Sequence, residues 1–163
     1  MQFQLVDQII DLASPKSIRA AKNLSLGEEY LADHFPAFPV MPGVLMLEAL
    51  VQSAAWLVRV ADDFAHSMIV LRELKSVKYG SFVEPGKQLL LTVDLAEEYS
   101  RDAKTLMYKG VGEVEGVSAV TARFAVERYN LQDRDAALAD VDIQLVNHYR
   151  GLYRTLRPHC QRT

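Results

Sequence analysis

Two ionisable side chains stand close together in the sequence, at positions where burial would be costly for a charge. His34 lies in a segment that carries three prolines within seven residues, and Glu48 lies in the almost entirely apolar run that follows. A neutral histidine is a suitable general base near neutral pH. A carboxylic acid in an apolar setting is a suitable general acid, because burial favours its protonated form. The pair therefore indicates acid–base chemistry on a bound substrate.

Two neighbouring residues supply what such chemistry also needs. Gly43 opens the apolar run, and the first turn of a helix has free N–H groups that can meet the negative charge developing on a carbonyl oxygen. Gln52 stands four residues after Glu48, hence on the same helical face, where it could orient the carboxyl group. A structural role remains the alternative for each of the four: a satisfied buried histidine, a carboxylate that reaches solvent, a flexible helix start and a structural amide.

The elements that must position these residues follow from the prolines and the apolar pattern. Pro36, Pro39 and Pro42 exclude a helix or a central strand, so the segment of His34 is a rigid loop. Residues 43–61 are apolar nearly all round and contain no breaker, which predicts a helix buried on most of its faces. Such a helix needs cover on most sides, and a strongly curved antiparallel sheet would supply it.

Strand patterns occur on both sides of this helix. Residues 18–26 alternate like a strand, and residues 3–12 fit either a short strand or a helical turn. Apolar residues at helical spacing over about 135–157 predict an amphipathic helix. Four β-like runs joined by short turns predict an antiparallel meander, at residues 67–79, 88–96, 105–114 and 118–129. We therefore expect an α+β domain of about five to six strands over residues 1–130, with a helical extension over 131–163.

Composition excludes several classes of protein. Half of the 163 residues are apolar and about a quarter are charged, as in ordinary globular proteins. A net charge of −3 without a dense basic run gives no sign of a nucleic-acid binder. The single cysteine, Cys160, excludes an intrachain disulfide framework and fits a reducing compartment. With no signal-peptide pattern and an apolar run that falls short of a membrane span, we expect a cytoplasmic protein.

The chemistry expected here needs no metal and no cofactor. His66, His148 and His159 have no partner at metal-ligand spacing, so no metal site is predicted. The sequence also lacks a glycine-rich phosphate loop. Trp56 and the methionines near the helix are expected in the core rather than along a substrate tunnel.

The stretch HFPAFPVMPGVLMLEALVQ, from His34 to Gln52, resembles the active-site segment of the 3-hydroxyacyl-acyl carrier protein dehydratases of fatty acid synthesis, the FabZ/FabA type. A weaker likeness extends from about Phe3 to Tyr129, and the last thirty or so residues lie outside it. The resemblance implies a hotdog fold, in which a curved antiparallel sheet wraps around a long central helix. It also implies an obligate homodimer whose active sites pair the histidine of one subunit with the acid of the other. Whether such dimers assemble further, as a trimer of dimers, stays open.

Carried over residue by residue, the resemblance implies a role for each candidate. His34 matches the catalytic histidine and Glu48 the catalytic acid. Gly43 matches the residue whose backbone N–H polarises the thioester carbonyl, and Gln52 matches the glutamine one turn beyond the acid. The implied reaction is dehydration of 3-hydroxyacyl-acyl carrier protein to the trans-2-enoyl thioester, in fatty acid or related polyketide biosynthesis. An acidic acyl carrier protein would need a local basic patch, to which Arg72, Lys75, Lys78 and Lys87 could contribute.

The chain departs from the family pattern on either side of His34. Asp33 and Ala37 stand where the family usually has glycine, and Ala37 would be strained if its position required a positive φ. These departures bear on rate and acyl-group preference more than on reaction type. Two other functions stay open. One is a hotdog acyl thioesterase, since that fold also places a carboxylate on its central helix. The other is a non-catalytic acyl-binding hotdog protein.

Overall fold

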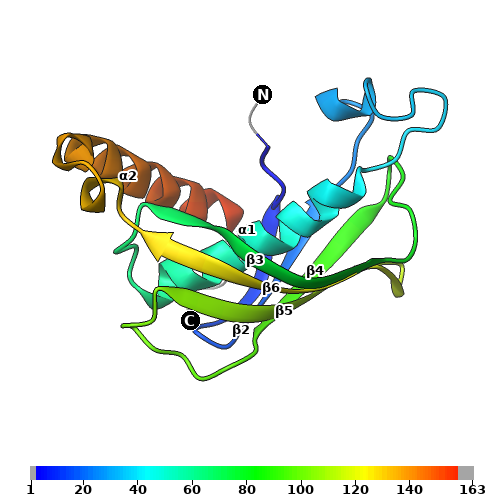
Figure 1. The fold of residues 1–163 in the computed structure, drawn as a ribbon. Coiled ribbons are helices and arrows are strands. Elements are labelled where there is room, and N and C mark those ends of the chain that lie inside the picture. The colour runs from blue at the N-terminus through cyan, green and yellow to red at the C-terminus, as the bar shows by residue number, and fades with distance from the viewer. Residues whose placement is uncertain (1–2, 158–163) are drawn as a thin grey trace, which may run out of the picture.

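A curved antiparallel sheet wraps around one long helix, and a second helix lies beside the far end of the first (Figure 1). The structure is a computed structural model that describes residues 3–157, so Cys160 and His159 lie outside the described residues. The arrangement confirms the expected α+β class and the hotdog architecture. The helices are α1 (Gly43–Ala61) and α2 (Ala139–Leu156), with three short 3-10 turns, η1 (Glu29–Leu31), η2 (Leu131–Asp133) and η3 (Ala136–Leu138). The strands are β1 (Gln8–Ala13), β2 (Ser17–Asn23), β3 (Met68–Tyr79), β4 (Gln88–Leu95), β5 (Thr105–Val114) and β6 (Val117–Tyr129).

Helix α1 is the core of the molecule, and its bounds match those predicted. It starts directly after Pro42. Because proline has no N–H to donate to the carbonyl four residues before it, the helix does not extend to the residues that precede Pro42. Its middle packs closely on β5, because Gly110 leaves the Leu50 side chain room that an added Cβ would take. By length and hydropathy α1 could cross a membrane. The expectation that this apolar run falls short of a membrane span was therefore wrong. In the fold, however, 67% of that window is buried, as in the core helix of a globular domain.

The strand order is β1-β2-β4-β5-β6-β3, which corrects the expected meander. Of the four strands expected in the meander, only β4, β5 and β6 follow one another as neighbours, whereas β3 pairs with β6 at the far edge of the sheet. The link over residues 80–87 is too long for a tight hairpin. It instead crosses from one edge of the sheet to the strand beside β2. Both β1 and β3 are therefore edge strands.

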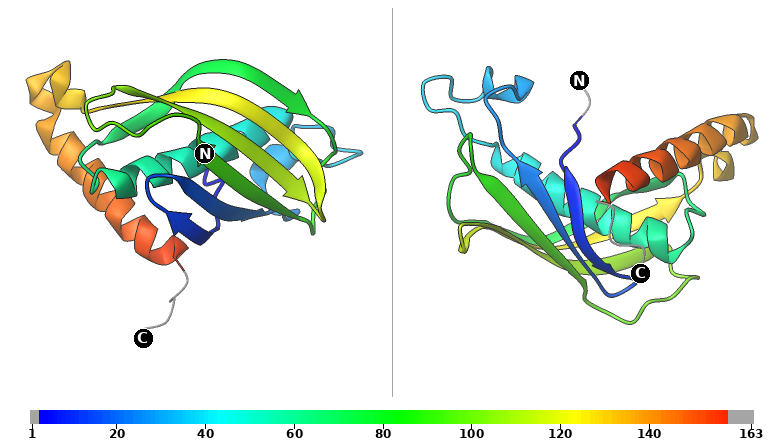
Figure 2. Two further views of the ribbon diagram at one scale, coloured as in Figure 1. Left: turned by 90° about the horizontal axis from the view of Figure 1, so that it is seen from below. Right: turned by 180° about the vertical axis from the view of Figure 1, so that it is seen from behind.

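Helix α2 lies beside the C-terminal half of α1, on the side away from β4 and β5 (Figure 2). Its apolar face places Tyr149 and Tyr153 against Trp56 of α1, with ring centroids 5.8 and 6.1 Å apart. Its first turn is fixed by the buried Asp142 carboxylate, which accepts a hydrogen bond from the Ser67 hydroxyl. The same carboxylate accepts backbone N–H bonds of 2.9 Å from the 3-10 turn η2. The helix is thus docked at both of its ends.

The stability of this docking should depend on pH through Asp142. Burial would raise the pKa of the Asp142 carboxyl, but hydrogen bonds from the Ser67 hydroxyl and from the N–H groups of Gln132 and Leu131 lower it below its usual value. As the pH falls, Asp142 therefore takes up a proton in the unfolded chain before it does so in the folded protein. Its contribution to the free energy of unfolding is present above about pH 4 and is lost as the pH falls through the lowered pKa.

We expect Asp142→Asn to lower the urea midpoint of unfolding at about pH 6. Between about pH 6 and pH 3 the midpoint of the variant should then fall less than that of the wild-type protein. Circular dichroism followed during urea titration measures both effects. The matched control is Asp140→Asn, since Asp140 is an exposed carboxylate in the same turn. Equal behaviour of the two variants would contradict the role given to Asp142.

Candidate active site

Glu48 and Gln52 form one hydrogen-bonded unit on α1. Gln52 Nε2 donates to Glu48 Oε1 at 3.1 Å and to the Phe3 carbonyl at 2.9 Å. Gln52 Oε1 accepts the N–H of Leu5 at 3.0 Å. One amide group therefore orients the half-buried Glu48 carboxyl and attaches the N-terminal segment to the helix.

A pocket of about 180 Å³ opens beside this unit. The central helix forms one wall, the N-terminal segment and α2 form the others, and Ile69 at the start of β3 completes it. Glu48 and Gln52 lie on its wall, so the carboxyl group faces a space that a small ligand could enter. The lining residues are Phe3, Gln4, Glu48, Val51, Gln52, Ala55, Trp56, Arg59, Ile69, His148 and Tyr149.

The first turn of α1 presents unpaired N–H groups. Within residues 3–157, neither Gly43 nor Val44 donates its backbone N–H to a protein acceptor, whereas the next residues bond to the Pro42 carbonyl. The ring of Tyr79 covers Gly43 so closely that an added Cβ would lie 3.0 Å from a ring carbon. A glycine at this position therefore makes room for the Tyr79 ring, and the unpaired N–H groups of the first turn are the donors that a carbonyl oxygen could use.

His34 lies in the loop between η1 and α1, where it is half-buried. Its ring packs on Phe35, with centroids 4.5 Å apart. The end of the loop is fixed by Met41, whose N–H donates to the Val83 carbonyl at 2.9 Å. Phe35 adopts a positive φ of 49°, whereas Ala37 does not, so the strain considered for Ala37 is absent. Asp33 is exposed and pairs with no charged group in the described part of the chain.

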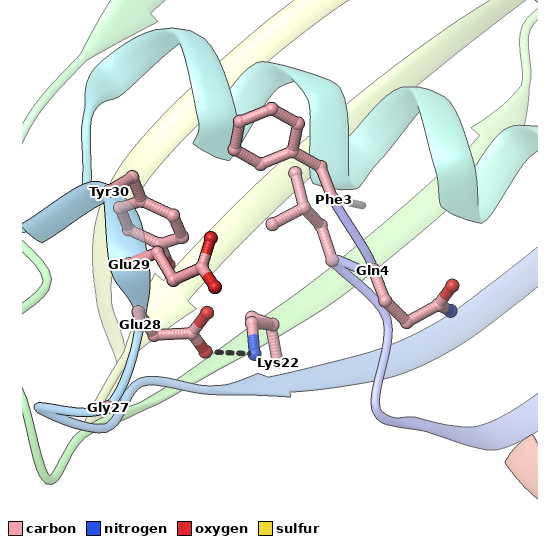
Figure 3. Close-up of a pocket in the computed structure, with 8 residues that line it drawn as sticks. Phe3, Gln4, Lys22, Gly27, Glu28, Glu29 and Tyr30 are labelled. Atoms are coloured by element: carbon pink, nitrogen blue, oxygen red, sulfur yellow. Dashed lines mark hydrogen bonds and ion pairs between the residues drawn. The ribbon is translucent and has the colours of Figure 1, made fainter. Parts of the chain in front are cut away.

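The start of this loop is fixed by a buried lysine of β2 (Figure 3). Lys22 Nζ lies 2.6 Å from Glu28 Oε1 and 3.2 Å from Asp7 Oδ2. Tyr30 lies against Phe3, and burial raises the pKa of its phenol. The ion pairs join β2, the N-terminal segment and the residues just before His34. They explain how Lys22 is buried without an energetic penalty for an unpaired charge.

Within one chain, the structure brings together only part of the predicted set. Glu48 and Gln52 are in contact, and Gly43 lies at the start of the same helix. His34 does not line the pocket beside Glu48. Sequence reasoning missed Arg59, a buried cation on the wall of this pocket. The sequence shows Arg59 as the one basic residue in the apolar run, but it does not show that the side chain is buried.

The profile of the FabA-like domain matches residues 1–123. The chain belongs to the FabA-like family. Among the most similar proteins are 3-hydroxyacyl-acyl carrier protein dehydratases named FabZ. That of Gluconacetobacter diazotrophicus is 37% identical over 125 residues, 76% of each chain. That of Burkholderia cenocepacia is 40% identical over 121 residues, 72% of this chain and 76% of the relative.

Solved structures agree on the fold of this FabA-like protein. The dehydratase heterocomplex ApeI:P from Xenorhabdus doucetiae matches with a TM-score of 0.65 at 17% identity, covering 83% of this chain and 89% of that one. A protein of Streptococcus mutans bound to acetyl CoA matches with a TM-score of 0.56 at 10% identity, covering 78% and 92%. At such identities the likeness concerns the fold alone. Helix α2 lies beyond the residues matched by the family profile.

In this FabA-like protein, Gln52→Ala should release the N-terminal segment. The substitution leaves the Leu5 N–H and the Phe3 carbonyl without their partners, which should cost about 1–3 kcal/mol of unfolding free energy. Amide hydrogen exchange at Leu5 should accelerate, and the melting temperature should fall. The control is Gln132→Ala, which removes an exposed glutamine side chain in η2. Unchanged amide exchange at Leu5 would show that Gln52 does not hold the N-terminal segment on α1.

Proposed function

We propose that this FabA-like protein dehydrates 3-hydroxyacyl-acyl carrier protein to the trans-2-enoyl thioester, as a hydro-lyase that needs no cofactor. The observation that supports this most is the Glu48–Gln52 unit, which places an oriented carboxyl group on a pocket wall, on the helix whose first N–H groups are unpaired. FabZ dehydratases that are 37–40% identical over most of the chain add weight to the choice of reaction.

In the proposed reaction, neutral His34 removes a proton from C2 of the acyl group. The electron pair moves toward the thioester carbonyl, whose oxygen accepts a hydrogen bond from the Gly43 N–H. Glu48 then protonates the C3 hydroxyl, the C3–O bond breaks, and water leaves. Gln52 holds the Glu48 carboxyl in place. His34 ends protonated and Glu48 ionised, and a proton exchange through solvent restores both.

The site is proposed to be shared between two copies of the chain. Within one chain His34 does not line the Glu48 pocket, so a second His34 has to reach it. Edge strand β3 is the proposed contact, because an unpaired edge invites pairing with a like strand. Its outer residues Leu71, Leu74 and Tyr79, together with Phe82 beyond it, are 38–65% exposed. Measurement of the molecular mass in solution will distinguish a homodimer from a trimer of dimers.

The proposed partner that carries the acyl group is an acidic acyl carrier protein in the cytoplasm. Arg72, Lys75 and Lys87 each lie within 4 Å of a glutamate, at 3.9, 2.6 and 2.7 Å. Lys78 has no such partner among residues 3–157. Because Lys78 precedes Tyr79, which covers the start of α1, it is the favoured contact for an approaching carrier protein.

The direct test follows the ultraviolet absorbance of the conjugated enoyl thioester. Wild-type protein should convert 3-hydroxybutyryl thioesters to crotonyl thioesters and catalyse the reverse hydration. Release of free thiol without enoyl formation would instead identify a thioesterase. Binding of the thioester without either reaction would identify a non-catalytic acyl-binding protein.

A further inference from the structure

One face of α1 lines the pocket from Glu48, at the proposed reacting end, to the buried side chain of Arg59. Glu48, Gln52, Trp56 and Arg59 follow one another at spacings of four, four and three residues, and all four line the pocket. Glu48 and Arg59 are thus separated by about 16 Å along the helix axis. Because of this separation, the two groups mark opposite ends of the space.

Arg59 is buried but lacks an acceptor. Its exposed fraction is 6%, and its Nε has no hydrogen-bond partner among the residues that the structure describes. Its guanidinium carbon lies 3.7 Å from the Tyr149 ring centroid and 5.1 Å from that of Trp56. Burial lowers the pKa of the guanidinium to about 10, although Tyr149 acts in the opposite direction. No carboxylate in residues 3–157 lies within 4 Å of it.

This arrangement differs from that of the other buried basic residues. Lys22 and Arg128, which are similarly buried, both have carboxylate partners and backbone carbonyls. A guanidinium has five N–H donors in a planar fork, and leaving the buried Nε of Arg59 without an acceptor is costly. Stacking on two aromatic rings fixes the plane of the Arg59 group while leaving its N–H edge available. The fork is therefore set to receive a planar oxygen acceptor.

We propose that this pocket holds the far end of the acyl group, and that Arg59 binds a carboxylate carried there. The inference rests on the proposed function, because it takes Glu48 as the reacting end. Helix α2 supplies the wall of this subsite through Tyr149 and His148. Because α2 lies beyond the residues matched by the family profile, the wall that α2 supplies is outside the matched domain. The substrate class is then an acyl thioester that ends in a carboxylate.

The test compares two saturated thioesters of equal length, one ending in a methyl group and one in a carboxylate, by calorimetric titration. Wild-type protein should bind the carboxylate-ended thioester about 10- to 100-fold more tightly, the range of a charge-assisted hydrogen bond. In Arg59→Met this ratio should fall to near one. The matched control is Arg150→Met, which removes the same charge from the exposed side of α2, and it should keep the wild-type ratio.

The ratio of the two affinities distinguishes binding of the carboxylate by Arg59 from a role of Arg59 in packing against α2. If Arg59 served only to hold α2, Arg59→Met would weaken both thioesters alike and leave their ratio unchanged, which would overturn the inference. Equal affinities in the wild type would overturn it as well. Should Arg59→Met not fold, Arg59→Lys keeps the charge without the planar fork and should reduce the ratio. Because saturated thioesters have no 3-hydroxyl group and cannot be dehydrated, this outcome is independent of dehydration, and loss of dehydration alone would refute only the proposed function.

Discussion

Glu48→Gln should lower kcat for dehydration by about 10²–10⁴-fold, because an amide cannot protonate the departing C3 hydroxyl. The substitution keeps the size of the side chain, and the contact with Gln52 at 3.1 Å can be retained, so KM and the melting temperature should change little. Steady-state kinetics with a 3-hydroxyacyl thioester measures the effect. The control is Glu98→Gln, which alters an exposed carboxylate between β4 and β5.

His34→Ala should cause a loss of the same order, and mixing it with Glu48→Gln tests the shared site. If each site takes His34 from one chain and Glu48 from the other, a mixed dimer contains one intact site. Subunit exchange between equal amounts should then restore about a quarter of wild-type activity. Absence of any recovery after verified exchange would place both residues in the same chain's site. Full activity of both single variants would refute the assignment altogether.

The second large effect concerns stability. Asp62, just beyond the end of α1, lies 2.6 Å from Arg128 of β6, and the two side chains are only 5% and 2% exposed. The same carboxylate receives the Tyr99 hydroxyl and lies 3.1 Å from His66 Nδ1. Asp62→Asn should cost about 3–5 kcal/mol of unfolding free energy, because Arg128 would remain as a buried charge without its counter-ion.

The adjacent residue provides the control for this change. Asp63 is 89% exposed at its side chain and lies 3.5 Å from Arg150. Asp63→Asn should therefore change the unfolding free energy by less than about 1 kcal/mol. Urea unfolding of the two variants measures the difference, and similar midpoints would show that the buried ion pair contributes little.

Local patterns in the sequence were enough to predict most of the fold. Pro42 and the acidic residues after Ala61 bound α1 on either side, so its limits were predicted correctly. Strands β4, β5 and β6 alternate clearly enough to be placed within a residue or so. The partner of β3 was predicted wrongly, because strand order depends on how the sheet curves around α1 and not on any local pattern.

The candidate site was harder to predict, because its parts come from distant segments. The contact between Glu48 and Gln52 follows from helical spacing and was expected. The attachment of Phe3 and Leu5 to Gln52 joins residues 47–49 positions apart, which no periodicity indicates. Arg59 was overlooked because a charge near the end of a helix is ordinarily solvated. Only the position of α2 shows that this one is buried.

The hydrogen bonds from Gln52 to the N-terminal segment have a practical consequence for assays. Phe3 lines the same pocket as Glu48, and its carbonyl is bonded to Gln52. An affinity tag fused ahead of it would therefore begin at the rim of the proposed site. Kinetic work on this protein should remove such a tag before measurement and compare the result with that for the tagged form.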